Sequence, residues 1–291
     1  MSEAVEVLVD AHHHVWDTAV RDYGWMDGAW ADPIRGRFDA DRYAEVTKPH
    51  GVTGSIAVQA LHDLGETYDL LYAADNPVET DAGDEPGPIQ GVVGWVDLTA
   101  SEVAEVLAEV REGPSGHALV GIRHQVQDEP DPQWLLRPPV VRGIAAVGAA
   151  GLVYDLLVKP PQADAALDVV RRLPEVSFVL DHAGKPGIAG GIWEPWATWI
   201  TALAALPNVA VKLSGLVTEA ATGWKPADIL PYARHVLSSF GPGRVMYGSD
   251  WPVCTLAASY EQVLALAGDA MSPGDRAAVF GGTARSVYGL G

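Results

Sequence analysis

Two histidines near the N-terminus have the residue type and spacing of a catalytic or metal-binding pair. An apolar run there ends in the residues Asp10-Ala11-His12-His13-His14. In a β-strand successive side chains point to opposite faces, so we expect His12 and His14 to share one face with Asp10, and His13 to point away. Two imidazoles on one face at the end of a strand are costly in an apolar core, and they suit a metal or catalytic site.

Polar residues also lie at the ends of seven further apolar runs. These candidates are Gln59, His62, Asp97, Arg123, His124, Lys159, Asp181, His182, Lys185, Lys212, Ser214 and Asp250. Of the nine histidines, His50, His117 and His235 are the ones that fall elsewhere. A single strand-end histidine is most often a structural group. Many such residues at one set of strand ends indicate a functional site.

The expected metal ligands are His12, His14, His182 and Asp250. Imidazole and carboxylate ligands suit zinc or a similar divalent ion, with one position open for water. Such an ion brings the pKa of its bound water to about 7. In the metal-free alternative, the same imidazoles donate hydrogen bonds to a carbonyl oxygen. The sequence leaves open whether a metal is strictly required.

Asp250 is the expected general base, since it is the carboxylate that ends the last apolar run. Arg123 and His124 are the expected catalytic stabilisers of an oxyanion, with Lys159 as a further candidate. The expected substrate-binding residues are Trp25, Gln59, Lys159 and His182. Lys185 and Lys212 carry no assigned role; Lys212 either points into the interior or forms an ion pair there.

The elements that position these residues alternate between strands and helices. Short β-branched runs predict eight strands, at residues 5–11, 53–59, 89–96, 119–123, 152–158, 176–180, 209–213 and 245–248. Apolar periodicity predicts helices between them, among others at 193–206, 227–240 and 260–267. Eight strand–helix units in 291 residues predict a single α/β domain over residues 1–291, a (β/α)8 TIM barrel with its site at the C-terminal ends of the strands. No Gly-x-Gly-x-x-Gly or phosphate-loop motif supports a nucleotide-binding fold.

Charge and cysteine content limit the classes of partner. The formal net charge of −19 disfavours nucleic acid and anionic membranes and favours a small-molecule substrate. No apolar run reaches membrane-spanning length, and the N-terminus lacks the pattern of a secretory signal. The single cysteine, Cys254, allows no internal disulfide, so we expect a cytoplasmic protein. Nothing in the composition indicates an oligomeric state.

Seven segments of the chain match motifs of one known superfamily. The segments are Asp10 to Asp17, Gly91 to Leu98, Gly121 to His124, Leu180 to Pro186, Lys212 to Gly215, Tyr247 to Pro252 and Val279 to Ala284. They resemble the amidohydrolase superfamily and, more narrowly, are similar to the lactonase branch that contains L-fuconolactone, L-rhamnonolactone and 2-pyrone-4,6-dicarboxylate hydrolases. Thr283 stands where many members have Asn.

The resemblance implies a (β/α)8 barrel that opens a lactone with an activated water, as a carboxylic ester hydrolase. It implies metal-binding or carbonyl-polarising roles for His12, His14 and His182, and a base role for Asp250. No lysine at residues 123–124 suits a bridge between two metals, which argues against a two-metal site. The lone Arg123 and the negative net charge favour a sugar lactone over a pyrone- or muconolactone-type carboxylated lactone. Two further functions are compatible with these residues, a metal-dependent decarboxylase and a non-catalytic binder of sugar acids.

Overall fold

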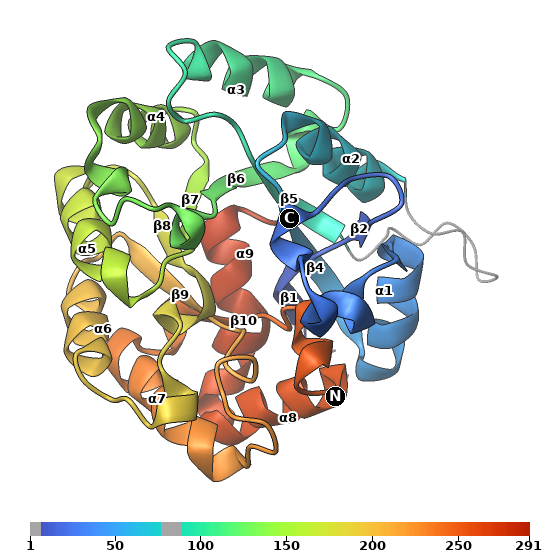
Figure 1. The fold of residues 1–291 in the computed structure, drawn as a ribbon, viewed down its shortest axis with the longest axis vertical. Helices are drawn as coiled ribbons and strands as arrows, with labels where there is room; N and C mark the ends of the chain where they lie inside the picture. The colour runs from blue at the N-terminus through green and yellow to red at the C-terminus, as the bar shows by residue number, and fades with distance from the viewer. Residues whose placement is uncertain (1–6, 77–88) are drawn as a thin grey trace, which may run out of the picture.

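Eight parallel strands form the sheet at the centre of this protein (Figure 1). The computed structural model describes residues 7–76 and 89–291. Neighbours in the sheet follow the order β1-β4-β5-β6-β7-β8-β9-β10. Their bounds are β1 Leu8–His13, β4 Val52–Val58, β5 Ile89–Gly94, β6 Leu119–His124, β7 Val153–Leu156, β8 Phe178–Leu180, β9 Val209–Leu213 and β10 Val245–Tyr247. Each predicted strand is present, although residues 5 and 6 of the first lie outside the described residues.

The sheet closes between its first and last strands. His13 of β1 forms an isolated parallel bridge with Trp251, which lies just beyond β10. The Asp250 amide donates to the His12 carbonyl at 2.8 Å, and the His14 amide donates to the Trp251 carbonyl at 2.6 Å. The predicted (β/α)8 barrel is therefore confirmed, and its closure joins Asp250 directly to the histidine strand.

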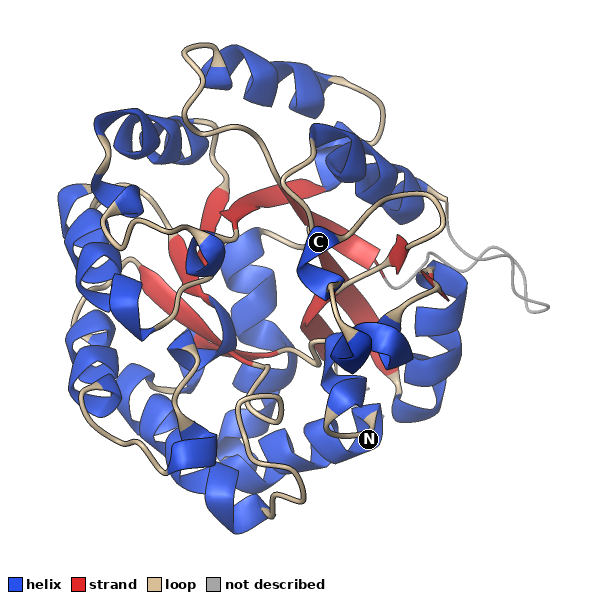
Figure 2. Ribbon diagram, viewed as in Figure 1, coloured by secondary structure: helices blue, strands red, loops and turns tan. Residues whose placement is uncertain are grey.

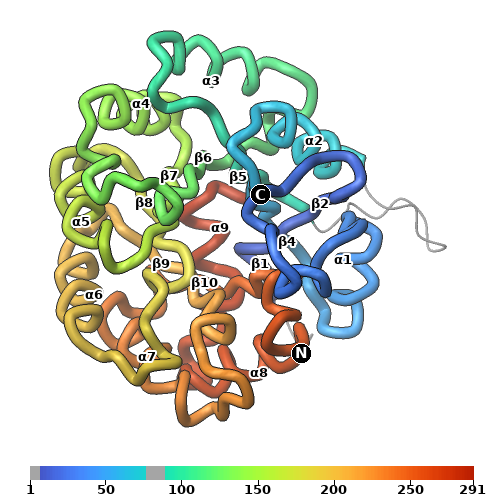
Figure 3. Tube along the Cα trace, in the orientation of Figure 1, coloured from blue at the N-terminus to red at the C-terminus, as the bar shows by residue number. Residues whose placement is uncertain are grey.

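Most of the helices surround the barrel on the outside, as Figure 2 shows. Their bounds are α1 Ala40–Thr47, α2 Leu64–Asp75, α3 Val103–Glu112, α4 Pro138–Ala149, α5 Ala163–Arg172, α6 Trp196–Ala204, α7 Pro226–Phe240, α8 Tyr260–Ala270 and α9 Thr283–Tyr288. Figure 3 shows these units following one another around the barrel in chain order. In the same view α9 falls inside the ring of strands, where Ala284 and Tyr288 pack against the apolar interior. No helix in the described ranges is long and apolar enough to cross a membrane.

Two apolar layers hold these elements together. Inside the barrel, Val9, Ile56, Val93 and Val179 are buried in one cluster. A second, larger cluster lies between the strands and the outer helices. Side chains of β-branched residues on both faces of each strand therefore become buried, as expected for a parallel sheet covered by helices.

A short antiparallel pair was not expected from the sequence. β2 (Trp16–Asp17) pairs with β3 (Arg37–Phe38) in the long connection after β1. Two residues are too few to show an alternating pattern. The pair frames the 3₁₀ turn that carries Trp25, whose ring centroid lies 5.7 Å from that of Trp16.

Candidate active site

A β-bulge in β1 sets the direction of its histidines. Asp10 pairs with Ser55, and His13 pairs with Ala57, so β1 has one extra residue between these positions. The extra residue interrupts the alternation of side chains along the strand. His12 points into the barrel, and His14 lies beside it, with their Nε2 atoms 3.3 Å apart. His13 instead stacks on Tyr43 of α1, outside the barrel.

The prediction that Asp10 shares a face with His12 and His14 is wrong, because the bulge turns it outward. Its carboxylate accepts hydrogen bonds from the hydroxyls of Tyr43 at 2.9 Å and Tyr260 at 3.2 Å. Its other oxygen accepts from the amides of Ser249 at 2.8 Å and His12 at 3.2 Å. Asp10 thus ties the backbone of β1 to the residue that precedes Asp250.

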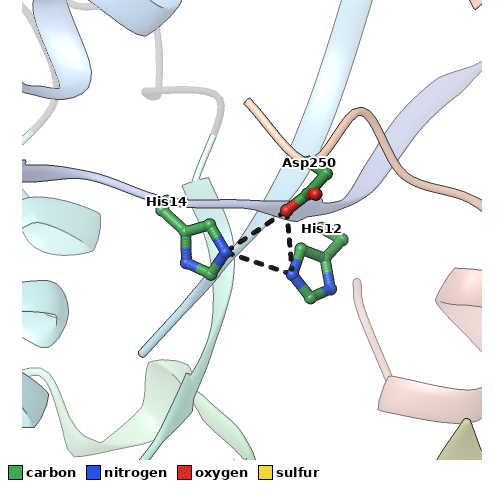
Figure 4. A group of neighbouring side chains, drawn as sticks. All are labelled: His12, His14 and Asp250. Carbon is green, nitrogen blue, oxygen red and sulfur yellow. Dashed lines mark hydrogen bonds and ion pairs between the residues drawn. The ribbon is translucent and has the colours of Figure 1, made fainter. Parts of the chain in front are cut away.

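His12, His14 and Asp250 converge on one point (Figure 4). Asp250 Oδ1 lies 3.7 Å from His12 Nε2 and 3.5 Å from His14 Nε2. His14 Nδ1 donates to the Val58 carbonyl at 2.7 Å, which leaves the lone pair of His14 Nε2 facing the cluster. His12 Nδ1 lies 3.3 Å from Asp181 Oδ1, an ion-pair distance, so a carboxylate lies behind this imidazole.

The donor set fits one zinc ion. Tetrahedral zinc with bonds of about 2.0–2.1 Å separates its ligand atoms by about 3.3–3.4 Å. The three separations here, 3.3, 3.5 and 3.7 Å, are close to that value. Two imidazole lone pairs that face each other beside a carboxylate are stabilised by a cation between them.

A second group of potential ligands contains His12, Asp181 and His182. The buried ammonium of Lys212 already lies within it, 3.1 Å from Asp181 Oδ1 and 3.3 Å from His12 Nδ1. Lys212 Nζ also donates to Asp155 Oδ2 at 2.5 Å. Lys212 therefore points into the barrel and supplies the positive charge at this second position.

Asp181 is the residue that sequence reasoning missed as a partner of His12. Burial alone would raise its pKa, but Lys212 and His12 hold the pKa of Asp181 well below its usual value. Its position directly before His182 at a strand end was the available signal.

Arg123 lies at the barrel centre with most of its donors occupied. Its Nη1 donates to Asp181 Oδ2 at 2.9 Å, and its Nε donates to Gln59 Oε1 at 3.2 Å. Its Nη2 donates to both the carbonyl and the side chain of Gln59. Gln59 therefore positions Arg123 beneath the site.

His182 projects from a strained turn after β8. His182, Ala183, Lys185 and Asp250 have left-handed φ angles of 52°, 50°, 52° and 59°. They are four of the five described non-glycine residues with positive φ. Such conformations cost about 1 kcal/mol or more each and are found at functional sites. His182 Nδ1 hydrogen-bonds with Ser214 Oγ at 2.9 Å, so its Nε2 is the nitrogen left for a metal or a substrate.

Gly215→Ala is expected to displace the His182 ring. A Cβ at residue 215 would lie 2.5 Å from His182 Nδ1, and φ there is +62°. We expect kcat/KM to fall about 10- to 100-fold, because small displacements of reacting groups have effects of this size. Gly223→Ala is the matched control, since φ is +75° there and nothing lies within 4 Å. Equal activity losses in the two variants, measured beside their melting temperatures, would show that backbone strain rather than His182 is responsible.

Charge states at the site follow from burial. Burial lowers the pKa of His12 and His14, and lowers the pKa of His182 to about 4. Burial by itself raises the pKa of an aspartate, yet His182, His14 and His12 together hold the pKa of Asp250 below its ordinary value. Near neutral pH the site therefore presents neutral imidazoles and an ionised carboxylate, the states that metal binding and proton abstraction require.

A pocket opens above this cluster. Of the predicted residues, His14, Trp25, Arg123, His182 and Asp250 line it. Trp25 donates its indole N–H to the Ala60 carbonyl at 2.9 Å, which fixes its ring in the wall. Sequence reasoning assigned no role to four further polar residues that line the pocket: Gln125, Gln127, Lys185 and Thr218.

Four predicted residues are not among those that line this pocket: His12 and Gln59, described above, and His124 and Lys159. His124 accepts from the Trp95 indole at 3.1 Å, and its Nε2 hydrogen-bonds with Glu129 at 2.7 Å, so both ring nitrogens are occupied. Lys159 is exposed and lies 3.7 Å from Asp128. We therefore carry neither His124 nor Lys159 forward as a catalytic or substrate-binding group.

Glu66 of α2 supports one wall from behind. Its Oε2 accepts from the amides of Ala60 at 2.9 Å and Leu61 at 2.8 Å. Burial raises the pKa of Glu66 from 4.5 to about 7. A carboxyl whose pKa is higher in the folded state gives stability that is complete below pH 4.5 and is lost as the pH rises to about 7.

Glu66→Gln is therefore expected to stabilise the protein most at alkaline pH. The amide can still accept from the two backbone N–H groups, but it never ionises. Relative to wild type, the free energy required to unfold the variant should be larger by about 3 kcal/mol at pH 8 than at pH 5. Melting temperatures at the two pH values test this, with Glu109→Gln on exposed α3 as control. A difference that does not change with pH would contradict the expectation.

Residues 9–290 match the family described as Amidohydrolase. This protein therefore belongs to the amidohydrolase family, as the resemblance of its segments predicted.

Its curated relatives include two L-fucono-1,5-lactonases from Burkholderia. The one from Burkholderia multivorans is 38% identical over 97% of this chain and 96% of the relative. The one from Burkholderia ambifaria is 36% identical over 96% of this chain and 94% of the relative. A crystal structure of a Burkholderia multivorans amidohydrolase with bound zinc has a TM-score of 0.85 and 38% identity, covering 98% of this chain and 100% of the other. These similarities bear out the predicted enzyme class, a lactone hydrolase, and support a divalent metal.

Proposed function

We propose that this protein hydrolyses an uncharged sugar lactone to its sugar acid, and that L-fucono-1,5-lactone is the first substrate to test. The observation that carries the proposal is the convergence of His12, His14 and Asp250 within 3.3–3.7 Å at the base of a polar pocket. Two relatives that cover nearly the whole chain carry this activity in their names.

The first step is proton transfer to Asp250. Its carboxylate accepts a proton from water, and the oxygen of that water forms a bond to the lactone carbonyl carbon. A divalent ion held by His12, His14 and Asp250 would supply Lewis acidity to the water and the carbonyl oxygen.

His182 is placed to stabilise the oxyanion that forms when the water attacks. When Ser214 donates to its Nδ1, His182 presents an Nε2–H to the pocket and can donate to the oxyanion. The carbonyl then reforms, the ring C–O bond breaks, and the ring oxygen takes the proton from Asp250. The product hydroxy acid ionises at neutral pH, so one proton is released for each ring opened.

The two cations of the pocket favour an uncharged lactone. Arg123 is paired with Asp181 at 2.9 Å, and Lys185 is paired with Glu219 at 3.3 Å. A pyrone dicarboxylate would need cations that are free to bind its carboxylates. A decarboxylase would also act on a carboxylate, so the same pairing disfavours that activity.

The single buried cysteine, Cys254, is consistent with a cytoplasmic location for a lactone hydrolase.

A screen of aldonolactones with a pH indicator tests the proposal. We expect acid release from L-fucono-1,5-lactone, and a strong reduction after chelator treatment that added zinc reverses. Ligand binding without acid release would contradict hydrolysis and indicate a sugar-acid binder. Release of carbon dioxide from an aromatic carboxylate, with no lactone opened, would indicate a decarboxylase.

A further inference from the structure

The connection between β6 and α4 carries two glutamines that the reaction does not use. Gln125 and Gln127 flank the first residue of a 3₁₀ turn at Val126–Asp128, and both line the pocket. Neither side chain contacts His12, His14 or Asp250 through any hydrogen bond in the described part of the chain. Their position in the wall makes them candidates for contact with the substrate rather than with the reacting atoms.

An aromatic stack fixes the backbone of this turn. The backbone N–H of Gln125 donates to His62 Nε2 at 3.0 Å. His62 stacks on His124 with centroids 3.8 Å apart, and His124 stacks on Trp134 at 4.1 Å. Burial lowers the pKa of His62 to about 4, so the ring that accepts this hydrogen bond is neutral near pH 7.

A second anchor holds the other side of the turn. The backbone N–H of Gln127 donates to the carbonyl of Leu157, a residue just after β7, at 3.0 Å. Because both backbone N–H groups are hydrogen-bonded, the two glutamine side chains extend from a fixed backbone. Hydrogen-bonding groups held in this way lose little entropy when they bind a ligand.

Within the residues that the structure describes, the Gln125 side chain forms no hydrogen bond, and the Gln127 side chain forms one. Gln127 Oε1 is buried, and no group in residues 7–76 or 89–291 donates to it. The side-chain nitrogen of Gln127, Nε2, makes a long hydrogen bond of 3.3 Å to the Asp128 carboxylate. A buried acceptor without a donor costs about 1–3 kcal/mol, so an acceptor kept in a pocket wall suits a donor that a ligand brings.

The charge around these glutamines identifies the chemistry of that ligand. The pocket cations Arg123 and Lys185 are each paired with a carboxylate, Asp181 and Glu219 respectively. Apart from the site residues His14, His182 and Asp250, the uncharged polar groups of the wall include the side-chain amides of Gln125 and Gln127, which can donate to and accept from hydroxyl groups.

We propose that Gln125 and Gln127 are specificity-determining residues that hydrogen-bond the ring hydroxyls of an uncharged sugar lactone. This proposal rests on the proposed function, because it names how the same pocket selects its substrate.

The test compares two lactones that differ in their hydroxyls. L-Fucono-1,5-lactone and δ-valerolactone share a six-membered lactone ring, and the second lacks hydroxyl groups. For Gln127→Met and Gln125→Met we expect kcat/KM for the sugar lactone to fall about 10- to 100-fold, since one lost hydrogen bond of about 1.4 kcal/mol is a factor of ten. The value for δ-valerolactone should stay within about twofold. Gln133→Met, on the same connection but exposed, is the control.

Two results would overturn the proposal. An equal loss on both lactones would show that the glutamines support the fold of the site, and no loss on the sugar lactone would show that they do not contact it. In either case wild-type activity on the sugar lactone would leave the proposed function intact. Wild-type protein that opens neither lactone would overturn both.

Glu219→Gln tests the charge pairing separately. Removal of this carboxylate frees Lys185, so kcat/KM for the lactone of an aldaric acid, which carries a carboxylate, should rise about tenfold. Activity on L-fucono-1,5-lactone should change little. No gain on the carboxylated lactone would mean that pairing of Lys185 does not exclude charged substrates.

Discussion

Asp250→Asn is expected to lower kcat/KM for the lactone by about 10³-fold, within the range that general base catalysis contributes. The carboxamide has nearly the same size, and Asn accepts left-handed φ angles such as the 59° at this position. The fold should therefore persist while the proton acceptor is lost. Initial rates from a pH indicator, with a melting temperature for each variant, measure the effect.

Asp97→Asn is the matched control for this variant. Asp97 also follows a strand of the barrel, β5, but its Oδ1 accepts from Thr99 and its side chain is exposed. Its activity should equal that of wild type. A folded Asp250→Asn protein with near-wild-type activity would mean that another group removes the proton.

Loss of one histidine ligand is expected to have the second large effect. His14→Ala removes one of three groups around the proposed ion, and zinc affinity should fall at least about 100-fold, because even partners of the ligands contribute 10- to 100-fold. Zinc content after gel filtration and chelator competition measure binding independently of activity.

His13→Gln provides the comparison on the neighbouring residue. His13 points to the other side of the strand, where its Nε2 hydrogen-bonds with Ser55 at 3.0 Å. This variant should keep its zinc even where its stability falls. Equal zinc loss in both variants would contradict the assignment of opposite directions to the two side chains.

Much of the barrel was predictable because eight buried strands leave eight apolar runs in the sequence. The rim position of His12, His14, His182 and Asp250 followed from strand ends and from the fold class. The direction of the Asp10 side chain could not be predicted. A one-residue bulge reverses the alternation of side chains along the strand, and no residue type in the sequence marks that bulge. The short pair β2–β3 was equally invisible.

The remaining site residues depend on contacts across the barrel. From the sequence, Lys212 could point into the interior or form an ion pair there. In the structure it does both, because its ammonium lies inside the barrel in contact with Asp155 and Asp181. Gln125 and Gln127 come just after a strand, as many loop residues do. Only the pocket distinguishes them from the exposed Gln133.

Anomalous diffraction at the zinc edge, from crystals grown with one equivalent of zinc, tests the central assignment most directly. A single peak about 2.0–2.2 Å from His12 Nε2, His14 Nε2 and Asp250 Oδ1 is the predicted result. A peak at Asp181 and Lys212, or no peak at the pocket while zinc appears elsewhere on the protein, would contradict it.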